Sequence, residues 1–507
     1  MKSMKLTPLT LVLALSLSQT FFSSGCTKKA AQDTSTIYVG LSAEPSTLDP
    51  RRATDATGMR LTNLIFTSIV RLGPDMEIIG EAASKWSYTK DTYHFDLRPG
   101  LKFHDGTAVT KEDLEFSFAE YRKDASPFAS ALSAIDTVTV TYGPAGGTLD
   151  LKLKKFSATL LTDLSPVKIL PATKVTAAGD DFGKNPIGSG PFKFVSADAN
   201  EIRLDANKEN PYAPPAINSV SFKIVREENT RFLKIMKGEL DLAQQELPPA
   251  KVNELEKKGL TVYKYPGLSM TYLLVNMNDP TLKSKDARHA LSAGINRDEI
   301  IRFKLEGMAQ VATSILPPHN AYYDGTLAIP TYDLEKARAL IKAAGLEGKE
   351  LTLKTSNSTQ AIENGKVIAS QLEKIGLKLN MQSFEWATFF ADVNKGNFQL
   401  ASMKWVGTTD PDIYRTAFHS AQLPPKGRNR GGYVNTKLDQ LVDSGNEIQD
   451  VRKRIDHYKK VQRLVYDDLP IIPLWYEYET AVISPKIKNF RAAKTGDYTA
   501  LTKVSKE

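Results

Sequence analysis

The sequence predicts an α/β protein with more than one lobe. The chain has 507 residues, which is ample for a buried core and exceeds what one compact unit usually holds. Its second half contains a strand, a helix and a strand at the spacing of a βαβ crossover, whereas its first third reads as hairpins around a helix. Cys26 is the only cysteine, so no internal disulfide forms and burial alone must sustain the core.

The first residues predict an export signal. MKSMK carries two lysines, LTPLTLVLALSL (6–17) is apolar, and FFSSGC ends in Cys26. A positive start, a short apolar run and small residues before a cleavage point are typical of a secretory signal peptide, here 1–25. The Gly-Cys junction resembles a lipobox, in which the cysteine thiol takes a diacylglyceryl group. We therefore expect a lipid anchor at Cys26.

Residues 26–35 are expected to form a flexible tether, because TKKAAQDTST lacks apolar periodicity. The alternative is an ordinary signal peptide with an incidental cysteine, and Ser23, where a lipobox usually has leucine, favours that alternative. Cleavage before Cys26 removes two lysines and lowers the formal charge from +8 to +6. This charge is mild and acids are interspersed throughout, so no nucleic-acid partner is expected.

The N-terminal third predicts an α+β subdomain. WSYTKDTYHFDL (86–97) alternates apolar and polar residues around a Lys-Asp turn, and TVTVTYGPAGGTLDLKL (137–153) forms two alternating strands around a loop rich in Gly and Pro. Between them, KEDLEFSFAEYR (111–122) has helical spacing. This subdomain should end near PIGSGPF (186–192).

Two scaffold helices are predicted next. DARHALSAGINRDEII (286–301) has apolar residues at helical spacing and Asp286 as a possible N-cap. YDLEKARALIKAAG (332–345) is a second helix, opened by Asp333 and closed by Gly345.

The βαβ unit follows. LTLKTS (351–356) and LKLNMQSF (377–384) predict strands, and ENGKVIASQLEKIG (363–376) predicts the crossover helix, so the strands should be parallel. A helix around 385–395 and a strand FQLASMKW (398–405) continue the pattern. In open α/β sheets, ligands bind beyond the carboxyl ends of the strands. This rule places a candidate site directly after Trp405.

The stretch KWVGTTDPD (404–412) contains an aromatic ring beside fixed negative charge, which suits a cationic ligand or one end of a peptide. GRNRGGY (427–433) sets Arg428 and Arg430 next to a Gly-Gly turn and Tyr433. This second stretch is either a guanidinium fork for a ligand carboxylate or a solvated loop.

Catalytic signatures are missing. The six histidines are dispersed without metal-ligand spacing, and neither a GxSxG elbow nor a phosphate-binding Gly-Lys-Ser/Thr loop is present. Ser165-Pro-Val-Lys168, Tyr433-Val-Asn435 and Lys494-Thr-Gly496 imitate the motifs of penicillin-recognising enzymes, but Ser165 and Tyr433 lie in different predicted domains. We expect no catalytic residue, no metal and no cofactor.

The order of these segments resembles the solute-binding proteins of peptide-type ABC importers (family 5, oligopeptide- and dipeptide-binding). The likeness runs from about residue 36 to 490. The segments that carry it include AEPSTLDP (43–50), AASKWSYTKDTYHFDLRPGLKFHDGTAVTKEDLEFSF (82–118), NPIGSGPFKF (185–194), MKGELDLA (236–243) and DLPIIPLWY (468–476).

The resemblance implies a bilobal periplasmic-binding-protein fold of class II type with an additional α+β subdomain. Lobe II would comprise 271–479 and the extra subdomain 73–186, and lobe I would be assembled from 33–72, 187–270 and 480–507. Hinge motion would close the lobes over the ligand, and a membrane permease would recognise the closed form. Binding and delivery of the ligand would break no covalent bond.

In many relatives the tryptophan begins a W-x-x-D motif whose aspartate pairs with the peptide α-amine. Here Thr408 stands at that offset, and the acids come later, at Asp410 and Asp412. Loss of one partner of a buried ion pair costs about 3–5 kcal/mol. Either Asp410 takes the role from a shifted loop, or the protein does not require a free N-terminus.

We therefore expect a monomeric, extracytoplasmic, lipid-anchored receptor that delivers peptides or peptide-like solutes to an ABC importer. The expected ligand-binding residues are Tyr272, Trp405, Thr408, Asp410, Asp412, Arg428, Arg430 and Tyr433. Two alternatives remain open. One keeps the fold and binds a nickel chelate, haem, a saccharide or an opine, and the other is a surface sensor or chaperone without import.

Overall fold

The computed structural model describes residues 35–507 except 130, 407 and 425–426. The predicted signal peptide over 1–25, the lipidation site Cys26 and the tether up to residue 34 lie outside the described residues. From Ser35 onward the chain forms one compact unit. Within that part of the chain, no helix has the length and apolar character needed to cross a membrane.

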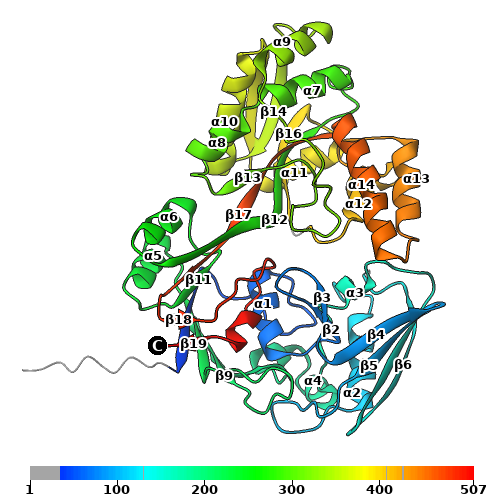
Figure 1. The fold of residues 1–507 in the computed structure, drawn as a ribbon, viewed down its shortest axis with the longest axis vertical. Coiled ribbons are helices and arrows are strands. Elements are labelled where there is room, and N and C mark those ends of the chain that lie inside the picture. The colour runs from blue at the N-terminus through cyan, green and yellow to red at the C-terminus, as the bar shows by residue number, and fades with distance from the viewer. Residues whose placement is uncertain (1–34, 130, 407, 425–426) are drawn as a thin grey trace, which may run out of the picture. The chain divides into compact units, whose positions relative to one another are not determined.

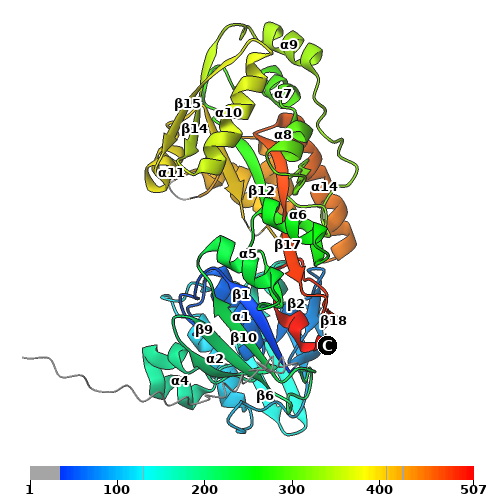
Figure 2. The ribbon, with the colours of Figure 1, turned by 90° about the vertical axis from the view of Figure 1, so that its left-hand side faces the viewer.

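One sheet of eleven strands runs through both lobes (Figures 1 and 2). Its order is β15-β14-β16-β12-β17-β11-β1-β10-β9-β8, and β13 also pairs with β17. The lobe I strands are β1 (Thr36–Leu41), β8 (Phe192–Ala197), β9 (Glu201–Ala206), β10 (Ser219–Ile224) and β11 (Leu242–Gln244). The lobe II strands are β13 (Ala309–Val311), β14 (Glu350–Ser356), β15 (Lys378–Phe384) and β16 (Leu400–Trp405).

Two long strands belong to both lobes. β12 (Thr261–Val275) and β17 (Ile471–Ile483) pair antiparallel along their length, with a register shift between Pro266 and Met270. In the lobe II half of β12 the residues alternate between two buried clusters: Tyr272 faces one, and Leu273 faces the other. Both faces of the sheet are therefore buried there, which explains why residues 270–275 are apolar apart from Thr271.

Lobe I and the extra subdomain share one hydrophobic core. It contains Val39 and Phe222 from the large sheet as well as Phe95 and Leu149 from a separate four-stranded sheet of order β4-β5-β7-β6. The lobe I helices are α1 (Ala56–Ile65), α5 (Glu228–Met236) and α6 (Pro249–Lys257), and a short C-terminal pair is formed by β18 (Ile487–Lys488) and β19 (Ser505–Lys506).

The extra subdomain has the hairpins and the helix that the sequence predicts. Its elements are β4 (Ala83–Thr89), β5 (Thr92–Leu97), β6 (Ile135–Gly143), β7 (Gly146–Leu153), α2 (Lys111–Tyr121), α3 (Leu160–Asp163) and α4 (Ala172–Ala178), with the hairpin β2 (Val70–Leu72) and β3 (Ile78–Gly80) before them. The Lys-Asp turn is tight, and Lys90 has a φ of 59°. Thr110 and Asp113 form a capping box that fixes the start of α2.

Lobe II is built from the predicted βαβ unit and its covering helices. β14 is parallel to β15 and to β16, and the crossover is made by α10 (Thr359–Glu373). The other lobe II helices are α7 (Lys285–Gly294), α8 (Arg297–Phe303), α9 (Leu334–Ala343), α11 (Trp386–Lys395), α12 (Ile413–Phe418), α13 (Thr436–Gly445) and α14 (Val451–Asp468).

The predicted helix over 286–301 is wrong in one respect, because the structure has two helices there. The side chain of Ser284, not Asp286, caps α7, and the side chain of Asn296 caps α8 by accepting a hydrogen bond from the Glu299 amide. A second cap inside the segment starts a new helix. The limits of α9 are as predicted, with Asp333 as its N-cap and Gly345 at positive φ after its end.

The C-terminus is fastened to lobe I by a buried ion pair. Lys506 Nζ lies 2.7 Å from Asp241 Oδ2, both side chains are about 1% exposed, and the ammonium also donates to the carbonyl of Thr36. The pair therefore connects the first strand, the β11 region and the penultimate residue of the chain.

We expect Lys506→Met to lower the free energy of unfolding by about 3–5 kcal/mol, because the Asp241 carboxylate stays buried without its cation. Urea unfolding followed by circular dichroism measures the change. Lys503→Met, three residues earlier and exposed, is the matched control and should change stability by less than about 0.5 kcal/mol. Equal effects of the two substitutions would contradict the assignment.

Candidate functional site

The candidate site begins where β16 ends. Trp405 is the last residue of β16 and lies opposite Met270 of β12, and Tyr272 lies opposite Met403. The Tyr272 and Trp405 rings are stacked, with centroids 6.4 Å apart and planes 12° apart. Tyr272 is only 2% exposed, so it lies beneath the Trp405 indole, on the side of the sheet.

A cavity of about 620 Å³ lies over these rings. Among its lining residues are seven of the eight that the sequence predicted for the ligand site: Tyr272, Trp405, Thr408, Asp410, Asp412, Arg428 and Arg430. The structure thus brings together residues of two loops, 408–412 and 428–430, that the sequence analysis treated separately.

Tyr433 is the exception. Its side chain is 3% exposed, and its hydroxyl donates to Asp468 Oδ2 at 2.6 Å. Its ring contacts Phe418 edge to face in the lobe II core. The stretch GRNRGGY contains no local signal that the chain turns inward after Gly432. We do not retain Tyr433 as a ligand-binding residue.

The 408–412 loop is held by backbone bonds as well as by its acids. The Thr408 amide donates to the carbonyl of Leu268 at 3.1 Å, at the register shift of β12, and Asn320 donates to the carbonyl of Thr409. Thr408 is 4% exposed, and its hydroxyl has no hydrogen-bond partner in the part of the chain that the structure describes. Such a buried hydroxyl is normally satisfied, so a ligand group is its natural partner.

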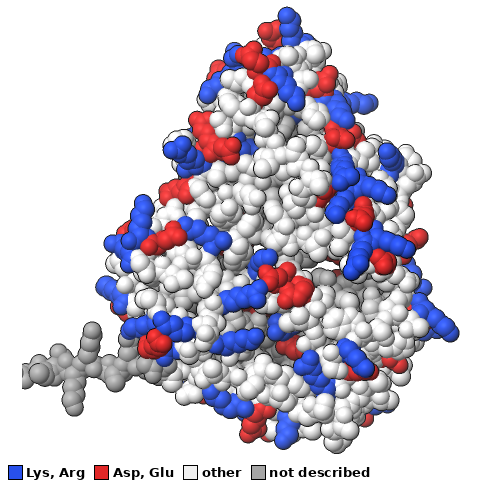
Figure 3. Space-filling view, viewed as in Figure 1, with Lys and Arg blue, Asp and Glu red and all other residues white. Residues whose placement is uncertain are grey.

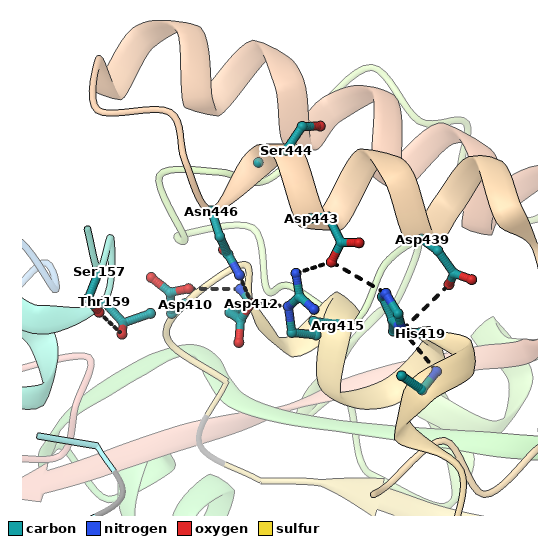
Figure 4. Close-up of polar contacts among 12 residues, drawn as sticks. Ser157, Thr159, Asp410, Asp412, Arg415, His419, Asp439, Asp443, Ser444 and Asn446 are labelled. Atoms are coloured by element: carbon teal, nitrogen blue, oxygen red, sulfur yellow. Dashed lines mark hydrogen bonds and ion pairs between the residues drawn. The ribbon is translucent and has the colours of Figure 1, made fainter. Parts of the chain in front are cut away.

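Three carboxylates form an acidic cluster: Asp163, Asp410 and Asp412. Asp410 lies 3.4 Å from the Arg454 guanidinium, and Asp412 accepts from Asn446 and lies 3.5 Å from Arg415. Figure 4 shows Asp410 and Asp412 on the loop that leads into α12, with Ser157 and Thr159 of the extra subdomain beside them. The cluster therefore contains residues of lobe II and, through Asp163, of the extra subdomain.

Burial and mutual repulsion govern the ionisation of this cluster. Burial raises the pKa of Asp163 to about 6, the hydrogen bond from Thr159 opposes this shift, and the charges of Asp410 and Asp412 add to it. Burial also raises the pKa of Asp410, against the attraction of Arg454. Asp410 and Asp412 thus make ionisation of Asp163 less favourable, and Asp412 has the same effect on Asp410.

A basic pair, Arg428 and Arg430, lines the same cavity. Arg430 Nε donates to Asn394 at 2.8 Å, and its guanidinium lies 4.8 Å from the centre of the Phe390 ring. Burial lowers the pKa of Arg430, Tyr272 opposes this shift, and the like charge of Arg428 adds to it. Among the described residues, no carboxylate forms an ion pair with Arg430, so a ligand anion would supply its missing counter-charge.

Sequence reasoning missed several lining residues, among them Asp163, Trp386 and Phe390. Trp386 is 54% exposed and is stacked on Phe390, with centroids 5.5 Å apart. An exposed tryptophan at the start of a helix is a signal that could have been read from the predicted amphipathic pattern. Asp163 has no such signal, because only the tertiary fold brings it to a loop almost 250 residues later.

The motifs that imitate penicillin-recognising enzymes have structural partners of their own. Lys168 is buried and donates to Ser68 Oγ at 2.7 Å, Tyr433 is bonded to Asp468, and Lys494 pairs with Asp75 at 3.0 Å. The described residues also contain no group of three His, Cys, Asp or Glu side chains placed to hold a metal ion.

The family model described as bacterial extracellular solute-binding proteins, family 5 Middle, matches residues 77–422. The chain belongs to this family. A family 5 solute-binding protein is a non-enzymatic transport component, as the missing catalytic signatures predict.

Individual relatives of this solute-binding protein cover almost its whole length. The probable D,D-dipeptide-binding periplasmic protein DdpA of Escherichia coli (strain K12) is 27% identical over 478 residues, 90% of this chain and 91% of that protein. HbpA2 from Haemophilus parasuis has a TM-score of 0.85 at 24% identity, covering 93% of this chain and 100% of that one.

A third relative was solved with a ligand. DppA from Helicobacter pylori, in complex with the peptide STSA, has a TM-score of 0.73 at 25% identity, covering 93% of this chain and 98% of that one. These likenesses confirm the predicted bilobal fold with its additional subdomain.

We expect Arg454→Gln to cost about 3–5 kcal/mol of unfolding free energy at pH 8, because Asp410 stays buried without its cation. The folded-state pKa of Asp410 would then rise further, so the cost should shrink at pH 5 as the carboxyl takes up a proton. Urea unfolding at both pH values measures this. Arg452→Gln, exposed on the same helix, is the control, and a cost independent of pH would exclude the pairing.

Proposed function

We propose that this protein is an extracytoplasmic receptor that binds short peptides and delivers them to an ABC importer. The observation that carries the proposal is a single cavity with two charge clusters of opposite sign that do not pair with each other. The acidic cluster contains Asp163, Asp410 and Asp412, and the basic pair is Arg428 and Arg430.

A zwitterionic ligand satisfies both clusters at once. An ammonium group offsets the repulsion among the carboxylates, and a carboxylate offsets the half-buried Arg430 charge. The stacked pairs Tyr272–Trp405 and Trp386–Phe390 offer flat apolar surface to a peptide backbone or side chain. The cavity volume of about 620 Å³ lies within the range for small ligands.

The relatives support a peptide ligand. DdpA is described as a probable D,D-dipeptide-binding protein, and DppA from Helicobacter pylori was crystallised with the peptide STSA. Peptide binders that rely on main-chain contacts leave side chains in wet pockets, so we expect broad specificity.

Delivery requires an open and a closed state. We place the hinge at the register shift between Pro266 and Met270 of β12. The proposed lobe boundaries at 270 and 479 lie next to this shift, on β12 and on its partner β17. The ligand shifts the equilibrium toward the closed form, which the permease then recognises. Neither state requires a second copy of the chain, so we propose a monomer.

The anchor is proposed from the sequence alone. A lone cysteine at the predicted cleavage point favours lipidation of Cys26 and attachment to a membrane outside the cytoplasm. On the face drawn in Figure 3, basic and acidic side chains are interspersed, which agrees with a small-molecule ligand and not with nucleic acid.

Identification of the bound ligand tests the proposal. The mature protein is purified without its lipid, mild acid releases what co-purifies, and mass spectrometry identifies it. A mixture of peptides supports the receptor assignment. An opine, a saccharide, haem or a nickel chelate would preserve the fold and overturn the ligand class, and unchanged peptide uptake in a deletion strain would favour a sensor or chaperone.

We expect Arg430→Gln to weaken binding of peptides with a free C-terminal carboxylate by about 10- to 100-fold, because a charge-assisted hydrogen bond is lost. C-terminally amidated peptides should bind both proteins alike. Isothermal titration calorimetry measures the four affinities. Lys395→Gln, an exposed charge at the end of α11, is the control, and equal losses for both peptide classes would remove Arg430 from carboxylate binding.

A further inference from the structure

The three carboxylates of the acidic cluster differ in how they are compensated. Asp410 has the Arg454 guanidinium, and Asp412 has Asn446 and Arg415. The carboxylate of Asp163 accepts a hydrogen bond from Thr159 Oγ1 at 2.6 Å, but among the described residues it forms no ion pair. Asp163 is therefore the member of the cluster whose charge still lacks a counter-charge.

Asp163 also has a distinctive position in the fold. It is the last residue of α3 in the extra subdomain, whereas Asp410 and Asp412 belong to lobe II. It lines the cavity over Trp405, and with Asp412 it also lines a neighbouring cavity of about 940 Å³. The side chain thus stands where the two cavities adjoin, on the opposite side of the cleft from the ligand loop.

The buried hydroxyl of Thr408 is an independent indication of a ligand group at this place. It lines the same cavity as Asp163, is 4% exposed and lacks a hydrogen-bond partner in the described part of the chain. An ammonium group has three donors and no acceptor, so it can donate to this hydroxyl and to a carboxylate together. A hydroxyl alone supplies no counter-charge, which leaves that role to a carboxylate.

We propose that Asp163 binds the ligand's ammonium group and determines the preference for a free amine, so that the counter-charge comes from the extra subdomain and not from the 408 position. This inference rests on the proposed peptide-binding function. Asp410 supports the loop through Arg454, and the ammonium bridges Asp163 and the lobe II side of the cleft.

The same geometry couples amine binding to closure. Without a cation, closure brings Asp163 toward Asp410 and Asp412, and like charges in a partly buried space repel. An ammonium group between them reverses the sign of this interaction, so it binds the closed form better than the open form. The charged groups that line the larger cavity with Asp163 are Lys155, Asp412, Arg415, Asp443 and Glu447. Those that line the cavity over Trp405 with it are Lys404, Asp410, Asp412, Arg428 and Arg430.

The test compares two peptide pools on two variants. A pool of synthetic tetrapeptides and its N-acetylated copy are each equilibrated with the wild-type protein, with Asp163→Asn and with Asp96→Asn, and retained peptides are quantified by mass spectrometry. Asp96 lies on β5 of the same subdomain in an exposed ion pair with Lys85, so its variant controls for the lost charge.

The wild type and Asp96→Asn should retain free-amine peptides about 10- to 100-fold better than acetylated ones. Asp163→Asn should reduce this preference to about threefold or less while it still retains peptides. An unchanged preference in Asp163→Asn, or no preference in the wild type, overturns the inference and leaves the peptide receptor intact. Retention of neither pool by the wild type overturns the proposed function itself.

Two further readouts separate ligand binding from a structural role. The affinity of the wild type for a retained peptide should fall as the pH drops from about 6 to 4, by up to about tenfold per pH unit. A proton on Asp163 removes the negative charge that binds the ammonium group, so the proton and the ligand compete for this carboxylate. Asp163→Asn should lose this slope. At pH 7.5 the melting temperature of ligand-free Asp163→Asn should be no lower than that of the wild type, because the substitution removes the repulsion from Asp410 and Asp412. A lower melting temperature would indicate a structural role for Asp163.

Discussion

The antiparallel pair β12 and β17 is the constraint on which the rest of the structure depends. These strands carry the backbone hydrogen-bond ladder from one lobe into the other, and their register shifts between Pro266 and Met270. The carbonyl of Leu268, within that shift, accepts the amide of Thr408. The proposed ligand loop is therefore bonded to the register shift that we propose as the hinge, and Trp405 and Tyr272 are positioned by the same ladder. The proposed ligand contacts and the proposed hinge thus belong to one backbone network.

The site keeps charges that the protein only partly compensates. Arg454 stabilises Asp410, and the Phe390 ring and Asn394 hold Arg430, but the acidic cluster and the basic pair remain separate. Full compensation inside the protein would remove the electrostatic gain that a ligand brings to the closed cavity. Incomplete compensation makes closure depend on what the ligand contributes, which is the differential binding that a transport receptor needs.

Local signals in the sequence predict most of the fold. Alternation gives β4 to β7, the Asp333 and Gly345 caps give the limits of α9, and the strand before Trp405 places the site at the end of β16. One error is local, because the cap at Asn296 starts a second helix inside a segment that periodicity makes continuous. Two results depend on tertiary structure instead: Tyr433 turns into the core, and Asp163 reaches the site from another subdomain. Composition and spacing contain no information on such distant neighbours.

The buried pair between Lys506 and Asp241 has a consequence for how the chain acquires its structure. Lobe I is assembled from segments near both ends of the sequence, and its buried ion pair needs Lys506. Lobe II lies between these ends as a continuous stretch. Synthesis and export proceed from the N-terminus, so lobe II can complete its core before Lys506 is available to lobe I. The first strand, β1, finds its partners β10 and β11 once residue 244 has emerged, but the Asp241 carboxylate stays buried without a cation until Lys506 arrives.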